Sequence, residues 1–382
     1  INDDFDLVIY SAAVTDENPE LIEARLKQIR TLSRKEALPI ILGDKKNYCV
    51  AGAHGKSTTT AILTSIMDGS AIIGAESKAF GSNVRYEKEN SVMIFEADES
   101  DGSFLNSNPY CAIVVNAEPE HMEYYDYNYE LFFNSYKTFI NSAKYRVLNA
   151  EDKFLSTLVG EIEANWLYPS RDITDIEFIL INDEPHTRFT LKDLGSFDVW
   201  GFGKHIALDA ALAILAANES MDIEIIREKI LTFKGIKKRF DIVGVEDESV
   251  IIDDYGHHPT EIKATFESVK EYALLKGFDK ITAIWQPHKY SRTIDNLEEF
   301  INCFEGAQEL IILPVWSAGE AKREIDFAEK FKRYNLTMAD KIQRANNTIS
   351  VIKDKEELKT LDNGLIIGFG AGDLTYQIRG AV

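Results

Sequence analysis

Cysteine, long apolar runs and basic charge are all scarce in this chain of 382 residues. Its three cysteines, Cys49, Cys111 and Cys303, lie far apart without C-x-x-C spacing, so neither a disulfide framework nor a zinc site is indicated. No apolar stretch approaches the roughly 18 uncharged residues of a membrane span. The first residues, Ile1–Asp4, are acidic and lack the apolar core of a signal peptide. We therefore expect a protein of the reducing cytoplasm without a membrane span.

The charge balance is strongly acidic, with 63 acidic residues against 42 basic ones and a formal net charge of −21 at pH 7. Because such a surface repels a phosphate backbone, no general nucleic-acid binding is expected. An anionic substrate needs a local basic site. Hydrophobic residues make up 45% and charged residues 27% of the chain, which is typical of a globular protein. The length predicts two or three domains.

The apolar periodicity predicts short strands that alternate with amphipathic helices, and hence α/β units with parallel sheets covered on both faces. Helical patterns follow Gly55, Tyr129, Ile206, Thr260, Asn296 and Ile325. Between residues 176 and 200 this rhythm is broken by three short strand patterns, at 178–180, 188–191 and 197–200. The other predicted strands are 6–11, 47–52, 91–97, 111–116, 145–148, 250–253, 281–285, 309–315 and 364–368.

Two boundaries divide the chain into segments 1–44, 45–239 and 240–382. The first segment is shorter than what usually folds alone. We interpret it as the later half of a small α/β domain, the second segment as a central domain, and the third as a C-terminal domain.

A glycine-rich turn joins the strand at 47–52 to the following helix, with Gly52, Ala53, His54, Gly55, Lys56, Ser57 and Thr58 in order. Glycines let backbone N–H groups surround phosphate oxygens, Lys56 supplies a positive charge and Ser57 can reach Mg²⁺. The spacing is G-x-x-G-K-S, shorter than the common phosphate loop. The alternative is an ordinary strand–helix turn with an incidental lysine.

Acidic side chains crowd the end of the strand at 91–97, where Glu96 is followed by Asp98, Glu99 and Asp101. Ligands bind at the carboxyl ends of parallel strands, and carboxylates there usually hold a hard cation such as Mg²⁺. A solvated acidic loop is the other interpretation.

Histidines and cations follow three further strands. His121 comes after the strand at 111–116, His257 after 250–253, and His288, Lys289 and Arg292 after 281–285. Helix capping explains single residues of this kind, but not two cationic loops at strand ends in an acidic chain. Together these features predict an enzyme that binds a nucleoside triphosphate, Mg²⁺ and an anionic second substrate.

The whole set of motifs resembles the Mur ligases, and among them most the branch that adds L-alanine. The resemblance is carried, in chain order, by Ser11-Ala12-Ala13, Asn18-Pro19-Glu20, Gly52–Thr60, Glu96–Ser103, Asn116–Met122, Phe233–Phe240, Asp253–Glu261, Gln286–Thr293 and Gly368–Asp373.

This resemblance implies a three-domain α/β architecture: a truncated N-terminal Rossmann-like domain for the UDP-sugar, a central P-loop ATPase domain and a C-terminal Rossmann-like domain. It also implies the reaction. ATP phosphorylates the lactyl carboxylate of UDP-N-acetylmuramate, and the amine of L-alanine attacks the acyl phosphate, as a step of peptidoglycan synthesis. Mg²⁺ is the implied cofactor.

Motif by motif, the resemblance assigns roles to single residues. Gly52–Thr58 match the ATP loop, with Lys56 on the phosphates, and Ser57, Glu96 and His121 match metal ligands. His205 and Asp209 match the adenine side, and Arg239 and Asp254 match further nucleotide contacts. Ser11, Tyr255, His257, His288, Lys289 and Arg292 match the substrate and amino-acid region. The expected catalytic set is Lys56, Glu96, His121, Asp254, Lys289 and Arg292.

Three departures qualify the match. Ile206 and Asp209 replace two asparagines of the adenine-side motif, and Lys289 stands where arginine is common. The glycine-rich turn of the first domain is not in the sequence. The alternatives are a Mur-type ligase for another amino acid or a peptide, a P-loop kinase or transport ATPase, and a nucleotide-binding module with little turnover. Ser100 and Tyr255-Gly256 argue against the peptide-recycling type.

Overall fold

The computed structural model describes residues 4–11, 13–246 and 248–380. The chain divides into two compact units. Unit 1 comprises Ile1–Asp175, Phe189–Val199 and Ala207–Phe233, and unit 2 comprises Ile176–Arg188, Trp200–Ile206 and Lys234–Val382. The three segments expected from the sequence, 1–44, 45–239 and 240–382, remain a prediction.

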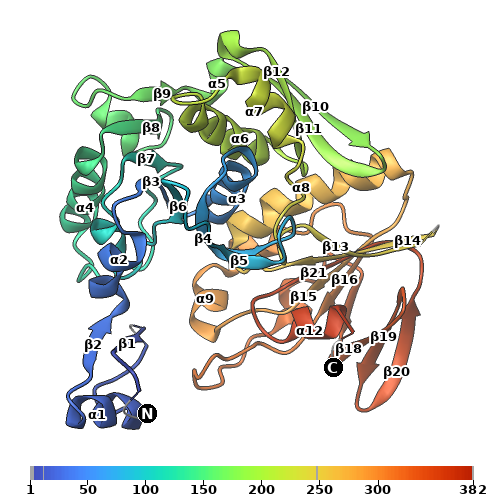
Figure 1. Cartoon of the computed structure of the whole chain (residues 1–382). Helices are drawn as coiled ribbons and strands as arrows, with labels where there is room; N and C mark the ends of the chain where they lie inside the picture. Colours follow the sequence, from blue (N-terminus) through green and yellow to red (C-terminus); the bar gives the residue numbers. More distant parts are fainter. Residues whose placement is uncertain (1–3, 12, 247, 381–382) are drawn as a thin grey trace. The chain divides into compact units, whose positions relative to one another are not determined.

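A seven-stranded sheet forms the centre of unit 1 (Figure 1). Its strand pairs are parallel except β4–β5 at one edge. The third strand in chain order, β3, is buried from Asn47 to Ala51, as expected of a strand covered on both faces. In spatial order the strands are β5 Ser82–Arg85, β4 Ser70–Ser77, β6 Val92–Glu96, β3 Lys46–Ala51, β7 Cys111–Val114, β8 Tyr145–Asn149 and β9 Asn165–Leu167.

The helices of unit 1 bury apolar faces against this sheet and its loops. In α4 (Tyr129–Ser142) the Asn128 side chain caps the N-terminus, and Phe132, Tyr136 and Phe139 enter the core. The alanine-rich helix α6 (Lys204–Ala217) is buried at every residue from Asp209 to Ala217. The remaining helices are α1 Pro19–Leu26, α2 Arg34–Leu42, α3 Lys56–Ile66, α5 Pro169–Asp172 and α7 Ile223–Ile230; β1 Leu7–Tyr10 pairs in parallel with β2 Arg30–Ser33.

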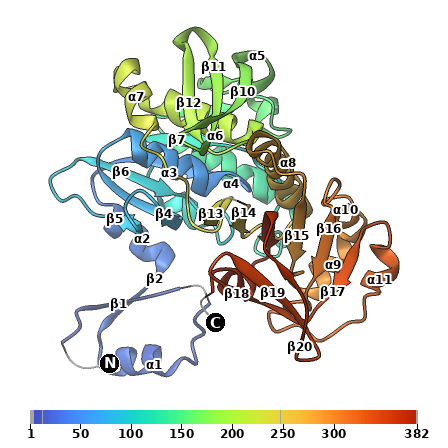
Figure 2. The same cartoon turned by 90° about the vertical axis from the view of Figure 1, so that its right-hand side faces the viewer.

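Unit 2 contains a six-stranded sheet, parallel except for the β13–β14 pair, and a separate antiparallel sheet of three strands (Figure 2). Ile342, Ile349 and Val351 of the small sheet share one core with Ile284 and Ile366 of the large sheet. In spatial order the strands are β13 Asp241–Glu246, β14 Ser249–Asp254, β21 Gly364–Phe369, β15 Ile281–Trp285, β16 Glu309–Ile312 and β17 Leu336–Met338, then β18 Lys341–Ala345, β19 Thr348–Lys353 and β20 Glu356–Leu361.

Helix α8 (Pro259–Lys276) is the longest of unit 2 and begins where the sequence predicts. His258 and Glu261 form a capping box, and Gly277 ends the helix in the left-handed conformation. Its apolar face is buried at Ile262, Phe266, Val269 and Ala273. The shorter helices are α9 Tyr290–Asp295, α10 Leu297–Ile301, α11 Phe327–Lys330 and α12 Leu374–Ile378.

The predicted alternation of strands and helices is confirmed, and so are the three strands between 176 and 200, which are β10 Ile173–Ile181, β11 Glu184–Leu191 and β12 Ser196–Trp200. The small sheet β18–β20 was not predicted. Among the described residues, no helix is both long and apolar enough to cross a membrane.

Candidate active site

The phosphate loop leaves the carboxyl end of β3 and ends at the first residue of α3. Gly52 has φ +146°, and a Cβ there would lie 3.1 Å from the backbone oxygen of Asn116. Gly55 has φ +82° in the left-handed region, directly before Lys56. Both positions therefore require glycine. The first N–H groups of α3 have no partner within the helix and are available to a phosphate group.

Asn116, which follows β7, holds the loop in shape from the side. The His54 N–H donates to Asn116 Oδ1 at 3.1 Å, and Asn116 Nδ2 donates to the His54 carbonyl at 3.0 Å. The His54 imidazole lies 3.5 Å from Glu120 and 3.7 Å from Glu118. The Asn116 side chain thus supplies the hydrogen-bond partners that the backbone of His54 would otherwise find in a neighbouring strand.

Ser57 and Glu96, two of the predicted metal ligands, contact each other. The Ser57 hydroxyl donates to Glu96 Oε1 at 3.0 Å, and the Gly74 N–H donates to Glu96 Oε2 at 2.6 Å. Both side chains offer hard oxygen ligands, which suit Mg²⁺. His121 has an exposed side chain and φ +51°, and takes no part in the Ser57–Glu96 contact. Among the described residues, no three His, Cys, Asp or Glu side chains gather into a metal-binding group.

Lys56 at the start of α3 has a buried carboxylate as its partner. Its ammonium group donates to Glu99, to the Ala53 carbonyl and to the Gly52 carbonyl. Glu99 was noted in the sequence only as one of several acidic residues. Its position three residues after Glu96, beyond the same strand, is the signal that could have identified it.

Asp209 of α6 lies against the same loop. It is 3% exposed, and a Cβ on Gly55 would lie 2.5 Å from its Oδ1 atom. Burial raises the pKa of its carboxyl well above the ordinary value, although the Thr59 side chain opposes the shift. The role of Asp209 in reading adenine stays a prediction. In unit 2, the imidazole of His205 lies against Gly203, and the side chain of Ile206 packs on Gly201.

In unit 2, Asp254 ends β14 as a buried acceptor. Its carboxylate accepts from the N–H groups of Phe240 and Gly256, each at 2.7 Å. Burial raises the pKa of Asp254 to about 6, while Arg239 and the two N–H groups lower it in part. Arg239 donates to Glu261 at 3.0 Å. Arg239 and Asp254 therefore share one charged neighbourhood, and their contact with a nucleotide stays a prediction.

The predicted amino-acid region also comes together in unit 2. The rings of His257 and His288 lie 5.8 Å apart, and Arg292 Nη1 lies 3.1 Å from His288 Nδ1. Burial, with the charges of His257, Arg292 and Lys289, lowers the pKa of His288 to about 4. His288 is therefore neutral at pH 7, and its Nδ1 accepts from the permanently charged guanidinium of Arg292.

Lys289 and Tyr255 flank this group. Lys289 precedes α9 with φ +68°, and its N–H donates to the Trp316 carbonyl at 2.8 Å. Tyr255 packs edge-on against His257 with ring centres 5.4 Å apart. Its partly exposed ring also lies 5.8 Å from the guanidinium of Arg239.

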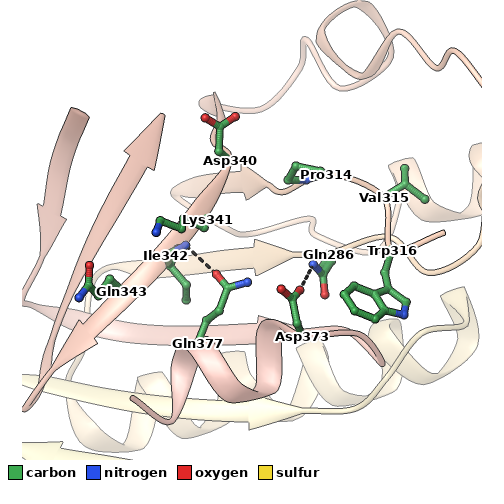
Figure 3. Close-up of a pocket in the computed structure, with 10 residues that line it drawn as sticks. All are labelled: Gln286, Pro314, Val315, Trp316, Asp340, Lys341, Ile342, Gln343, Asp373 and Gln377. Atoms are coloured by element: carbon green, nitrogen blue, oxygen red, sulfur yellow. Dashed lines mark hydrogen bonds between the residues drawn. The ribbon is translucent and has the colours of Figure 1, made fainter. Parts of the chain in front are cut away.

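A cavity of about 470 Å³ borders Gln286, at the start of the loop that carries His288 and Lys289 (Figure 3). Gln286 and Asp373 point toward one another, and Gln286 Nε2 donates to Asp373 Oδ1 at 2.6 Å. The indole of Trp316 lies beside them, and a Cβ on Gly372 would lie 2.7 Å from Trp316 Cγ. The hydrogen bond fixes the end of β15 to the start of α12. Trp316 and Gln286 were not singled out by the sequence as pocket residues.

Ser11, a further predicted substrate residue, belongs to unit 1. Ser11 is exposed just after β1, and its backbone carbonyl accepts from Val14. Ala12 of the same motif lies outside the described residues. The first segment contacts the acidic loop instead through Arg34, which lies 2.9 Å from Asp101.

Known proteins match this chain over nearly its whole length. Residues 238–367 match the Mur ligase, glutamate ligase domain. A UDP-N-acetylmuramate–L-alanine ligase of Campylobacter curvus is 54% identical over 377 residues, covering 99% of this chain and 86% of that protein. A protein of the same name from Helicobacter pylori strain P12 is 50% identical over 378 residues, covering 98% of this chain and 83% of that protein.

Solved structures share the fold. A UDP-N-acetylmuramate-alanine ligase from Thermotoga maritima aligns with a TM-score of 0.79 at 23% identity, covering 98% of this chain and 84% of that chain. A murein peptide ligase from Psychrobacter arcticus aligns with a TM-score of 0.57 at 18% identity, covering 99% of this chain and 86% of that chain. At these identities the likeness concerns the three-domain α/β architecture alone.

Proposed function

The chain belongs to the Mur ligase family, and from that premise we propose that it joins L-alanine to the lactyl carboxylate of UDP-N-acetylmuramate at the expense of ATP. The observation that carries the proposal is the 54% identity, over 99% of the chain, with a ligase of that name. The products are the amide, ADP and phosphate. The reaction belongs to peptidoglycan synthesis, and we place it in the cytoplasm because it consumes ATP.

The residues of unit 1 suit the phosphorylation step. Bringing a carboxylate to the γ-phosphate sets like charges together, so the site must neutralise them. The N–H groups at the start of α3 and the Lys56 ammonium supply positive charge at the loop. Ser57 Oγ and Glu96 Oε1, 3.0 Å apart, are the residues that would hold Mg²⁺. The metal, when bound there, neutralises phosphate charge.

The residues of unit 2 suit an amino acid as the second substrate. The Arg292 guanidinium offers a charged donor for the alanine carboxylate. His257 Nδ1 lies 3.1 Å from the Tyr255 carbonyl and donates to it, which leaves Nε2 as an acceptor for a proton of the alanine ammonium. Such a transfer is needed because only the free amine attacks the acyl phosphate.

The test is phosphate release from ATP in the presence of UDP-N-acetylmuramate and each of a set of amino acids, with mass spectrometry of the product. We expect release that depends on the nucleotide sugar and is fastest with L-alanine. The product mass should equal the two substrates joined with loss of water.

Other outcomes separate the remaining possibilities. Fastest turnover with another amino acid or with a peptide would assign a different Mur-type reaction. Nucleotide binding without release of phosphate would indicate a binding module. Release of phosphate at a rate that depends on neither cosubstrate would indicate a simple ATPase.

A further inference from the structure

The side chain of Lys56 is fully engaged by groups of its own chain. Its Nζ atom donates to the carbonyls of Gly52 and Ala53, the latter at 3.1 Å, and to Glu99 Oε1 at 3.2 Å. An ammonium group has three protons, so these contacts use all of its donors. The lysine that should bind phosphate is therefore held inside its own loop.

Glu99 is fixed in place by its backbone. Its carbonyl accepts from the Tyr125 hydroxyl at 2.6 Å and from the Gly102 N–H at 3.0 Å. The side chain of Glu99 is 1% exposed, and Tyr125 is also 1% exposed. The carboxylate therefore cannot follow Lys56 far if the lysine moves toward a phosphate.

The carboxylate is only partly satisfied by this lysine. Glu99 Oε2 lies 3.1 Å from Lys56 Nζ but is a buried atom without a hydrogen bond among the described residues. Burial raises the pKa of Glu99, and Lys56 lowers it in part. A negative charge in this position attracts Lys56 and repels phosphate groups, so it opposes nucleotide binding twice.

We propose that Glu99 is a positioning residue that holds Lys56 inside the loop, and that an incoming nucleotide must take the lysine away from it. The inference rests on the proposed use of ATP at this loop. Glu99 thereby lowers the affinity for nucleotide, and this favours release of ADP after each turnover. It acts through Lys56 and needs no contact with the substrate.

The test is a set of dissociation constants for Mg-ADP, measured by calorimetry on the whole chain. Glu99→Gln keeps the shape and removes the charge, and should tighten binding about three- to tenfold. Asp101→Asn is the matched control, because it removes one charge from the same loop, where Asp101 pairs with Arg34 at 2.9 Å. It should change the affinity less than about twofold.

A double-mutant cycle separates positioning from a general structural effect. In a Lys56→Gln background, Glu99→Gln should no longer tighten binding, because the group through which Glu99 acts is gone. In steady-state assays Glu99→Gln should lower KM for ATP by the same factor as the dissociation constant and change kcat less than about twofold. If Glu99→Gln does not fold, Glu99→Asp, which keeps the charge but is shorter, should tighten binding to a smaller extent.

Unchanged or weaker binding in Glu99→Gln would overturn the inference. So would an equal gain in Asp101→Asn, or a gain that persists without Lys56. If the parent binds Mg-ADP and Glu99→Gln binds it with the same affinity, the further inference fails but the proposed function stays intact. A parent that binds no nucleotide overturns both.

Discussion

The carboxyl of Asp209 lies directly against Gly55, so that a Cβ on Gly55 would lie 2.5 Å from Asp209 Oδ1 and 3.0 Å from Val115 Cγ1. Gly55 also has φ +82°, which side chains rarely adopt. Two independent constraints, backbone conformation and space, therefore keep this position small. The start of α3, where phosphate is expected, depends on a contact with α6 that is far away in the sequence.

Gly55→Ala should destabilise the protein and weaken nucleotide binding. The backbone strain costs about 1 kcal/mol and the displaced Asp209 carboxyl adds about 1–3 kcal/mol. Gly160→Ala is the matched control, because Gly160 has φ +87° but nothing within 4 Å of its Cβ position. Urea unfolding and Mg-ADP binding of both variants measure the difference. Equal losses in the two variants would show that Asp209 exerts no steric constraint.

Asp209→Ala tests whether this residue reads the base of the nucleotide. An ionised carboxylate would accept from the adenine N6 amino group and disfavour the guanine carbonyl. Burial, however, raises the pKa of Asp209, and a protonated carboxyl both donates and accepts. We therefore expect the ATP/GTP preference of the parent to be modest, about tenfold or less. The ratio of kcat/KM for ATP and GTP in parent and variant decides. An unchanged ratio means that Asp209 has no part in base reading.

Most of the fold could be predicted because buried parallel strands such as Cys111–Val114 are short, apolar and bounded by polar loops. The sheet β18–β20 was missed for a physical reason. In β18, for example, Ile342 is buried, while Lys341, Gln343 and Ala345 on the other face are exposed. Such strands resemble loops in composition, and their stabilisation comes from a distant core that no local pattern reveals.

The candidate site could be predicted in part. Lys56 and Ser57 follow the end of β3 and Glu96 ends the neighbouring strand β6, and the structure brings Ser57 and Glu96 into a hydrogen bond. Glu99 follows Glu96 by three residues, but its contact with Lys56, like the contact of Asn116 with His54, depends on the direction in which loop side chains point. The polarity of a residue indicates that it needs a partner, but only the fold determines which partner it finds.

Asp254 predicts a pH dependence of stability. Its folded pKa of about 6 is above the ordinary value of 3.8, so the folded protein keeps a proton that the unfolded chain releases. The resulting stabilisation is complete below pH 4, falls as the pH rises and is lost above pH 6, by about 3 kcal/mol in total. The measurement is the free energy of unfolding of the parent and of Asp254→Asn from pH 4 to 8. The difference between the two proteins reports Asp254, because the contributions of the other titrating groups cancel. A difference that is constant with pH would contradict it.

Glu96→Ala should raise the Mg²⁺ concentration needed for half-maximal turnover by about tenfold or more, because one of two oxygen ligands is lost. The fold should persist, since Glu96 is only partly buried. Glu87→Ala is the control, because Glu87 is an acidic residue of unit 1 whose carboxylate pairs with Arg85 at 3.5 Å. Turnover as a function of Mg²⁺ in parent and both variants is the measurement. An unchanged Mg²⁺ requirement in Glu96→Ala rejects the metal role.

Arg292→Lys should raise KM for L-alanine about 10- to 100-fold and leave KM for ATP within about twofold. The planar Arg292 guanidinium, whose Nη1 lies 3.1 Å from His288 Nδ1, can contact this nitrogen and a carboxylate at the same time. A lysine keeps the charge but has no planar group that could make both contacts. The pKa of His288 is lowered to about 4, so its ring stays neutral between pH 6 and 8, and its titration should not change KM for L-alanine in that range.

Arg333→Lys, in which the replaced guanidinium contacts the Ile301 carbonyl and Tyr334, is the matched control and should leave both constants unchanged. Initial rates at varied L-alanine and at varied ATP measure the two constants. A parallel rise of both would mean that Arg292 supports the nucleotide site or the fold, and the amino-acid assignment would then be wrong.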